Sequence, residues 1–219
     1  MTHIRAVFFD MDGVLVDACD WHYDAFNEAL AQHGYTIERG DHLARFDGLS
    51  TSQKLKILTD ERGLSPSLHR VIHETKQEIT MRLIRERAHP DPAHVSMLTR
   101  LRGRGYRTAV CSNAVRASVA LMMERIGLAP LLDLMLSNED VARGKPDPEI
   151  YLTAAARFGL QPAECLTVED NQNGLAAARA AGIHYLPVRN PDDVRYEAVV
   201  EAIERAEMGA AGDVSARQG

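Results

Sequence analysis

The segment IRAVFFDMDG, residues 4–13, decides how the rest of the chain is interpreted. Its apolar run from Ile4 to Phe9 is short, which is typical of a strand buried on both faces of a sheet. The run stops at Asp10, and Asp12 follows two residues later, just before Gly13. Residues two apart at the end of a strand point to the same side, so we expect both carboxylates to occupy one small volume.

The composition describes an ordinary globular chain and argues against several classes of protein. The 219 residues are 45% hydrophobic and 26% charged, with a formal net charge of −6, so no basic surface for nucleic acid or an anionic membrane is indicated. Cys19, Cys111 and Cys165 lie far apart, which favours small core side chains over a disulfide framework or a zinc site. No run approaches the length of a membrane span, and we expect a cytoplasmic protein.

Apolar runs recur along the chain and alternate with helical patterns. Further strands are predicted at Arg107–Cys111, Leu132–Leu136, Cys165–Val168 and Ile183–Val188. Helical patterns lie between or before them at Val95–Leu101, Ala114–Ile126, Pro148–Phe158 and Gly174–Ala181. Strands that alternate with helices predict an α/β fold, with a three-layer, Rossmann-like parallel sheet covered on both sides.

Residues 18–92 interrupt this alternation with helical periodicity and almost no strand signal. We therefore expect an α/β core of residues 1–17 and 93–206, an inserted all-helical cap domain at 18–92, and a disordered tail at 207–219. The insert begins and ends beside the first predicted strands, so it is expected over the carboxyl edge of the sheet. Open α/β sheets bind their ligands at that edge.

Polar groups follow four successive predicted strands. Beyond Asp10, these are Ser112 after the second strand, Lys145 in the loop after the third, and Glu169 and Asp170 at the end of the fourth. Each residue alone also suits a turn, a helix start or an exposed surface. A doubly wound sheet brings these ends together, which makes a common site the simpler interpretation.

The assembled set suits phosphoryl transfer. Two carboxylates in one volume need a proton or a cation, and Mg²⁺ prefers such oxygen ligands. One carboxylate can attack phosphorus to give an aspartyl-phosphate, which water then hydrolyses, while a second carboxylate donates and accepts the proton. Lys145 and the cation offset the repulsion between two anionic reactants.

Four ordered motifs resemble the haloacid dehalogenase superfamily, and within it the β-phosphoglucomutase-like sugar-phosphate phosphatases with a helical cap. The resemblance covers nearly the whole chain. It is carried by DMDGVLVD at 10–17, CSNA at 111–114, GKPDP at 144–148 and EDNQNG at 169–174, followed by an alanine-rich helix pattern.

The resemblance implies a role for each matching position. Asp10 is the expected nucleophile and metal ligand, Asp12 the acid and base that also offers its backbone carbonyl to Mg²⁺, and Asp170 the remaining metal ligand. Ser112 and Lys145 are expected to hold the phosphoryl group.

Two further positions have supporting roles by resemblance. Glu169 is expected to support Lys145 or the metal, and Asn113 to make a phosphate or orienting contact.

Dehalogenases resemble this chain but lack the second aspartate, because displacement of halide needs no proton donor. Asp12 therefore favours phosphate esters.

The insert is expected to select the substrate. His22 and Lys76 occupy places where mutase-like relatives carry substrate-facing groups, and the segment 48–51, with Ser50 and Thr51, resembles the mutases' substrate loop. Those mutases carry an arginine after the serine that grips a second phosphate, whereas this chain has Thr51. We therefore predict a phosphatase acting on a sugar or sugar-acid phosphate, with a phosphosugar mutase as the alternative.

Two non-enzymatic interpretations fit the sequence less well. A receiver-like phospho-acceptor module places its acceptor aspartate after the third strand, where this chain has Ser137 and Asn138. A metabolite-binding module would lack a catalytic residue, and none is missing. The expected partner is a small phosphorylated metabolite, without nucleic acid or membrane, and the expected assembly is a monomer or a weak homodimer.

Overall fold

The structure is a computed structural model that describes residues 3–46 and 49–209. Its contacts divide the chain into two compact units. The core unit contains residues 1–17 and 89–219, and the insert unit contains residues 18–88. Within the described residues, the sheet belongs to the core unit and the insert unit is built from helices and turns.

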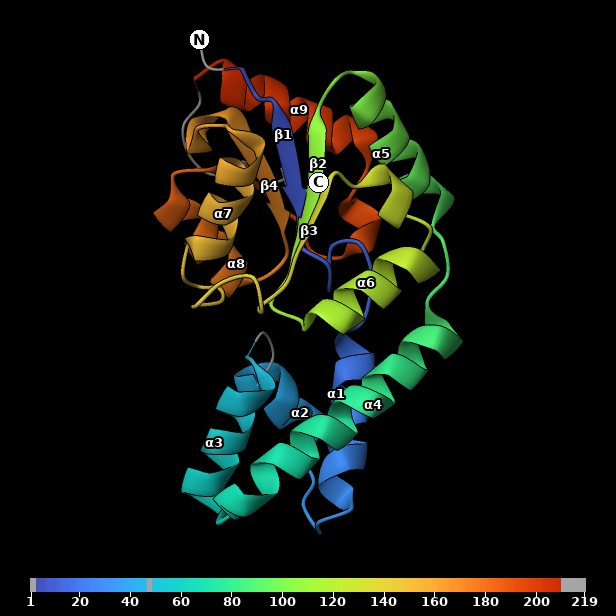
Figure 1. Ribbon diagram of the computed structural model, residues 1–219, viewed down its shortest axis with the longest axis vertical. Coiled ribbons are helices and arrows are strands. Elements are labelled where there is room, and N and C mark those ends of the chain that lie inside the picture. Colours follow the sequence, from blue (N-terminus) through green and yellow to red (C-terminus); the bar gives the residue numbers. More distant parts are fainter. Residues whose placement is uncertain (1–2, 47–48, 210–219) are drawn as a thin grey trace. The chain divides into compact units, whose positions relative to one another are not determined.

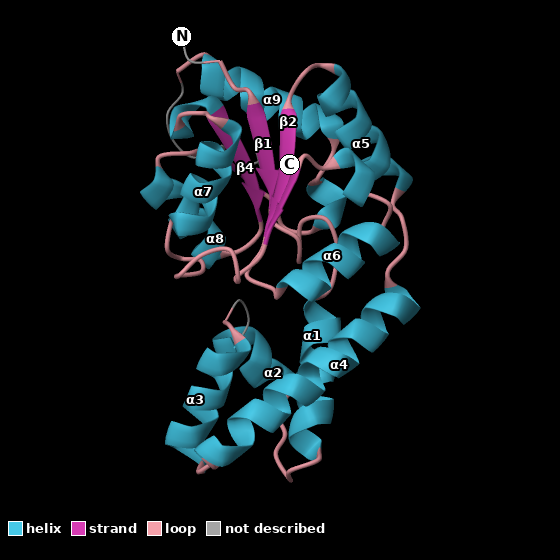
Figure 2. Ribbon diagram, viewed as in Figure 1, coloured by secondary structure: helices cyan, strands magenta, loops and turns pink. Residues whose placement is uncertain are grey.

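The core unit is built on a parallel five-stranded sheet in the order β3-β2-β1-β4-β5 (Figures 1 and 2). The strands are β1 (Ala6–Phe9), β2 (Arg107–Cys111), β3 (Leu134–Leu136), β4 (Cys165–Glu169) and β5 (His184–Pro187). The predicted α/β class with a parallel sheet is therefore confirmed. β3 starts later than predicted because Leu132 first closes a 3₁₀ turn over Ala129–Leu131.

The central position of β1 decides where the polar strand ends meet. Phe9 pairs with Val110 of β2 on one side and Val168 of β4 on the other. The backbone N–H of Asp10 then donates to the carbonyl of Val168 at 3.0 Å. All four residues of β1 are fully buried, which accounts for the unbroken apolar run.

Helices cover both faces of this sheet (Figure 1). Helices α7 (Glu149–Phe158) and α8 (Gln172–Ala181) contact one another and one face, α5 (Pro92–Gly103) and α9 (Tyr196–Glu207) cover the other, and α6 (Arg116–Arg125) contacts β3. Cys111 and Cys165 lie in the apolar cluster under α7 and α8, as small buried side chains. None of the helices in the described ranges is long and apolar enough to cross a bilayer.

The insert unit packs around its first and last helices. It contains α1 (Cys19–Ala31), α2 (Arg39–Asp41), a π-helical turn (His42–Phe46), α3 (Thr51–Arg62), a 3₁₀ turn (Pro66–Leu68) and α4 (His69–Arg87). Phe26 and Leu30 of α1 are buried in the same cluster as Ile72 and Leu83 of α4. Ser50 forms a capping box with Gln53 that starts α3.

The first residue of the predicted tail belongs to the last helix of the core unit. Helix α9 reaches Glu207, and the Glu207 carboxylate accepts a hydrogen bond from the Ile4 backbone N–H at 2.9 Å. Glu207 itself is therefore helical. Residues 210–219 of the predicted tail lie outside the described residues.

His94 on α5 is a buried histidine that faces several charged groups. It is 2% exposed, and its Nε2 donates to the carbonyl of Pro191 at 3.1 Å. Burial lowers the pKa of His94 from its usual value, while the hydrogen bond to Pro191 and the charge of Asp91 oppose this; Arg195 lowers the pKa further and Asp192 raises it. The net direction is downward, so the folded protein favours the neutral ring.

His94 should therefore contribute less stability to the core unit in mild acid. The unfolded chain binds a proton at His94 more readily than the folded chain does, so the contribution of His94 to the free energy of unfolding should fall as the pH drops through about 6.5 toward the lower folded pKa. Denaturant unfolding of the wild type and of His94→Gln at several pH values measures this. His94→Gln keeps a side-chain donor but does not titrate, so the wild type should lose stability relative to the variant as the pH falls; an unchanged difference between the two would contradict the assignment.

Candidate active site

Three neighbouring strands place acidic and hydroxyl side chains at one edge of the sheet. Asp10 follows β1, Ser112 follows β2, and Glu169 is the last residue of β4, with Asp170 next. Because β1 lies between β2 and β4 in the sheet, the residues at the carboxyl ends of these three strands are neighbours. The loop after β3 supplies Lys145, so four separate stretches of sequence meet here.

Lys145 is the centre of this cluster. Its Nζ donates to Asp10 Oδ1 at 2.8 Å, to Glu169 Oε1 at 2.6 Å and to the backbone carbonyl of Cys111 at 2.7 Å. Three acceptors thus match the three protons of the ammonium. Burial opposes the charge on Lys145, but the charges of Asp10 and Glu169 outweigh it and hold its pKa well above the usual value.

The loop that carries Lys145 is held by side chains at both ends. Asn113 Nδ2 donates to the Lys145 carbonyl at 3.0 Å, and the Lys145 N–H donates to Asn113 Oδ1 at 2.9 Å. The Glu149 carboxylate accepts from the N–H groups of Ala142 and Arg143 at 2.8 and 3.0 Å. Asn113, predicted to contact phosphate or to orient a neighbour, therefore orients the lysine backbone in this structure.

Three carboxylates converge beside the lysine. Oxygens of Asp10, Glu169 and Asp170 all lie within 4.8 Å of one another. Burial raises the pKa of Asp10, and the charge of Asp12 adds to the rise. Burial and the charge of Asp10 raise the pKa of Asp170 to about 6. Burial is thus the main reason that these carboxylates resist carrying a charge, although Lys145 opposes the rise at Asp10 and Asp170.

The arrangement fits a hard divalent cation. It offers carboxylate oxygens in a small volume, which is the donor set that Mg²⁺ prefers. Glu169 is fully buried, and its Oε2 has no hydrogen-bond partner among the described residues. Asp10 and Asp170, both predicted ligands, belong to this cluster, and so does Glu169, for which we predicted a supporting role. The Asp12 carboxylate is not part of this cluster, and a contribution from the Asp12 backbone carbonyl stays a prediction.

The phosphate-binding candidates lie next to the cluster. Ser112 is buried, its N–H donates to the carbonyl of Leu136 at 3.0 Å, and its Oγ accepts from the Ala114 N–H at 3.1 Å. This bond uses a lone pair of Ser112 Oγ and does not engage its hydroxyl proton. Lys145 contacts the carbonyl of Cys111, the residue before Ser112.

Two glycines make room for the acidic side chains. A Cβ on Gly13, whose φ is +81°, would lie 2.0 Å from Asp170 Oδ2. A Cβ on Gly174, near the start of α8, would lie 2.0 Å from Glu169 Cδ. The sequence motifs contain these glycines because the carboxylates lie against the backbone.

Replacing Gly174 by alanine should therefore damage both stability and the site. In an unobstructed helix this change stabilises by about 1 kcal/mol, but here the methyl group forces Glu169 or the helix to move, at a cost of about 1–3 kcal/mol. Denaturant unfolding of Gly174→Ala should show a net loss. Gly103→Ala on α5 is the matched control, since its Cβ would meet nothing within 4 Å; equal stability of both variants would contradict this explanation.

Tyr151 is a member of the site that the sequence motifs did not reveal. It lies on α7, is fully buried, and its hydroxyl donates a short hydrogen bond to Glu169 Oε1. A tyrosine on the buried face of a helix needs a hydrogen-bond partner for its hydroxyl. This general rule is the signal in the sequence that could have pointed to Tyr151. The sequence could not show which group the partner is.

The substrate candidates of the insert unit lie on three of its elements. His22 Nδ1 and Lys76 Nζ are 3.3 Å apart and link α1 to α4. Ser50 caps α3, and Thr51 is the first residue of that helix. Gly48, the first residue of the predicted substrate loop, lies outside the described residues.

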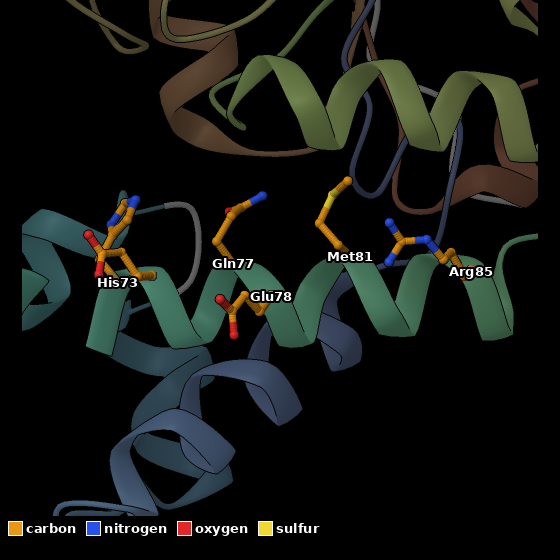
Figure 3. Close-up of a pocket in the computed structure, with 6 residues that line it drawn as sticks. His73, Gln77, Glu78, Met81 and Arg85 are labelled. Carbon is orange, nitrogen blue, oxygen red and sulfur yellow. The ribbon is translucent and has the colours of Figure 1, made fainter. Parts of the chain in front are cut away.

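A hollow of about 490 Å³ lies along α4. Four of its lining residues follow one another at four-residue intervals on that helix (Figure 3): His73, Gln77, Met81 and Arg85. Residues four apart lie on the same side of a helix, so this side of α4 combines polar, cationic and apolar groups.

The fold and the site define a class of hydrolases that process phosphate groups: a parallel α/β core with a buried lysine between carboxylates at adjacent strand ends. Comparison with known proteins supports this class. The family model for haloacid dehalogenase-like hydrolases matches residues 7–188. The chain belongs to this family, and the predicted superfamily and type of enzyme, a phosphatase, are confirmed.

The names and titles of individual relatives refer to phosphorylated carbohydrates. A phosphorylated carbohydrates phosphatase of Thermotoga maritima is 28% identical over 183 residues, 82% of each chain. The β-phosphoglucomutase of Bacillus subtilis is 27% identical over 187 residues, 82% of this chain and 81% of its own. The structure of CbbY from Rhodobacter sphaeroides with xylulose-(1,5)bisphosphate has a TM-score of 0.76 at 25% identity, covering 84% of this chain and 87% of that one.

Proposed function

We propose that this protein is a Mg²⁺-dependent phosphatase that hydrolyses a small phosphorylated metabolite, a sugar or sugar-acid phosphate, through an aspartyl-phosphate on Asp10. The observation that carries the proposal is the position of Lys145, whose ammonium bridges Asp10 and Glu169 while Asp170 lies within the same cluster. Attack on an anionic ester requires a positioned nucleophile and positive charge that offsets the repulsion between the two anions. A buried Asp10, the fixed Lys145 cation and a second cation site would supply these.

The reaction then takes two steps at Asp10. A carboxylate oxygen of Asp10 forms a bond to phosphorus as the bond from phosphorus to the substrate oxygen breaks, and Asp12 gives that oxygen a proton. Asp12 next takes a proton from water, whose oxygen attacks phosphorus and releases phosphate from Asp10. Ser112 and Lys145 would bind the phosphoryl oxygens, and Lys145 would exchange one of its three present acceptors for a phosphoryl oxygen.

The metal would be held by Asp10, Asp170 and the backbone of Asp12, with Glu169 beside it. When bound, Mg²⁺ offsets the negative charge that accumulates between the nucleophile and the phosphoryl group. The fit of the three clustered carboxylates and the buried Oε2 of Glu169 support this assignment.

The helical insert is proposed to act as the cap that excludes water and selects the substrate. Its polar groups at His22, Ser50, Thr51 and Lys76 are the candidates for contacts to the part of the substrate beyond the phosphate. The names of the relatives favour a phosphorylated carbohydrate. Thr51 in place of the mutases' arginine favours hydrolysis over isomerisation.

A substrate panel tests the proposal directly. Phosphorylated sugars, sugar acids, glycolate and nucleotides are assayed for released phosphate with Mg²⁺ and again after EDTA treatment. We expect release from one or more sugar or sugar-acid phosphates, abolished by EDTA and restored by added Mg²⁺. Activity that survives metal removal would overturn the metal assignment, and no release from any compound would overturn the proposed function.

A second incubation decides the mutase alternative, which the similarity to β-phosphoglucomutase keeps open. The protein is incubated with β-glucose 1-phosphate and a trace of the bisphosphate. Phosphate release above glucose 6-phosphate formation supports the phosphatase, and the opposite ratio supports the mutase.

A further inference from the structure

Tyr151 is bonded to the group that holds the active-site lysine. Its hydroxyl donates to Glu169 Oε1, the same oxygen that accepts from Lys145 Nζ at 2.6 Å. Lys145 in turn donates to Asp10 Oδ1 at 2.8 Å. A continuous chain of hydrogen bonds therefore runs from the phenol on α7, through two side chains, to the proposed nucleophile.

The environment of Tyr151 leaves its hydroxyl little freedom. The residue is fully buried, and its ring stacks on Phe8 of β1 with centroids 6.4 Å apart and planes 5° apart. The Lys145 ammonium lies 5.0 Å from the centre of the same ring. A ring fixed in this way presents its hydroxyl at one place, toward Glu169.

The Tyr151 hydroxyl is one of two side-chain donors that hold the Glu169 carboxylate. The same carboxylate lies against the backbone of Gly174, where a Cβ would lie 2.1 Å from either carboxylate oxygen. Lys145 and Tyr151 both bind Oε1, and Oε2 has no hydrogen-bond partner among the described residues. Without the phenol, one donor fewer would hold a fully buried carboxylate.

We propose that Tyr151 is a positioning residue: its hydroxyl holds Glu169 in the orientation that keeps the Lys145 ammonium on Asp10. The phenol suits this task because it donates a hydrogen bond without adding charge to the cluster of carboxylates. The inference rests on the proposed function, since it names a residue that acts on the same site through Glu169.

The first test compares Tyr151→Phe with Tyr185→Phe. Tyr185 also packs against the core cluster, but its hydroxyl accepts from Arg179 at 3.1 Å. With the best substrate of the panel, we expect Tyr151→Phe to lower kcat about tenfold and to change KM less than about twofold, the loss of one hydrogen bond that acts in the transition state. Tyr185→Phe should change neither constant. Unchanged kcat in Tyr151→Phe would overturn the proposal.

A double-mutant cycle separates positioning from a general loss of stability. If Tyr151 acts through Glu169, then Tyr151→Phe should lower kcat little further in a protein that already carries Glu169→Gln. If the phenol only supports the fold, the two effects should multiply. Multiplying effects would count against the proposal, whatever the size of each single effect.

A readout without turnover keeps this test distinct from the test of the function. In protein with isotope-labelled lysine, the NMR signal of the Lys145 ammonium is assigned by its loss in Lys145→Met. It should move in Tyr151→Phe and stay in place in Tyr185→Phe. If the wild-type protein releases no phosphate from any compound, the proposed function fails and this signal alone decides: a shift supports ordering of Lys145 by Tyr151, and an unmoved signal overturns it.

Discussion

Asp10→Asn is expected to lower phosphatase turnover by about 10⁴-fold or more, the scale on which loss of a covalent nucleophile acts. An amide oxygen is a poor nucleophile toward phosphorus, so the aspartyl-phosphate cannot form. The fold should persist, because asparagine has the same shape and its Oδ1 can still accept the hydrogen bond that Lys145 gives Asp10 at 2.8 Å. Released phosphate measures the first effect and thermal unfolding the second.

The control for this prediction is Asp192→Asn. Asp192 is an aspartate of the core unit whose side chain is 90% exposed, and it pairs with Arg195 at 3.2 Å. It should keep full turnover. Turnover by Asp10→Asn near the wild-type rate would remove Asp10 from the role of nucleophile.

Lys145→Met should have the second largest effect, because it acts on stability and turnover together. Lys145 is buried between Asp10 and Glu169. Removing one partner of a buried ion pair typically costs about 3–5 kcal/mol, since the other charge stays buried without compensation. Turnover should fall by about 10³-fold, the scale on which loss of a fixed group that stabilises developing charge acts.

The measurement is denaturant unfolding with and without Mg²⁺, alongside phosphate release. Lys56→Met is the matched control: Lys56 is 76% exposed and pairs with Asp60 at 3.0 Å on the surface of α3, a kind of pair that contributes about 0.3–0.5 kcal/mol. Added Mg²⁺ should restore part of the stability lost in Lys145→Met by offsetting the same carboxylates. Wild-type stability in Lys145→Met would contradict the central place of this lysine.

The sheet could be predicted because its strands carry a strong local signal. β1 and β4 are buried along their whole length, so both runs are apolar, apart from Thr167 in β4, and end at the acidic residues. β3 lies at the edge of the sheet, where Met135 is 39% exposed, and its predicted start was two residues too early. Element boundaries are set by packing, which a local pattern does not report.

The cluster of Asp10, Ser112, Lys145, Glu169 and Asp170 could be anticipated for a topological reason. Parallel strands have their carboxyl ends at one edge, so polar residues that end successive strands must gather there. The connections among these groups could not be anticipated in the same way. That Lys145 contacts the Cys111 carbonyl depends on the path of one loop.

The amino-acid sequence alone determined the α/β alternation, the helical insert between the first two strands, and the order of acidic, hydroxyl and cationic groups at the strand ends, because these depend on local periodicity and on which residue follows which run. Tertiary structure alone decided that Asn113 holds the Lys145 backbone, that Gly13 and Gly174 make room for carboxylates, and that Tyr151 meets Glu169. These contacts join residues far apart in the chain. They depend on how each helix is rotated against the sheet, which close packing of the whole core determines.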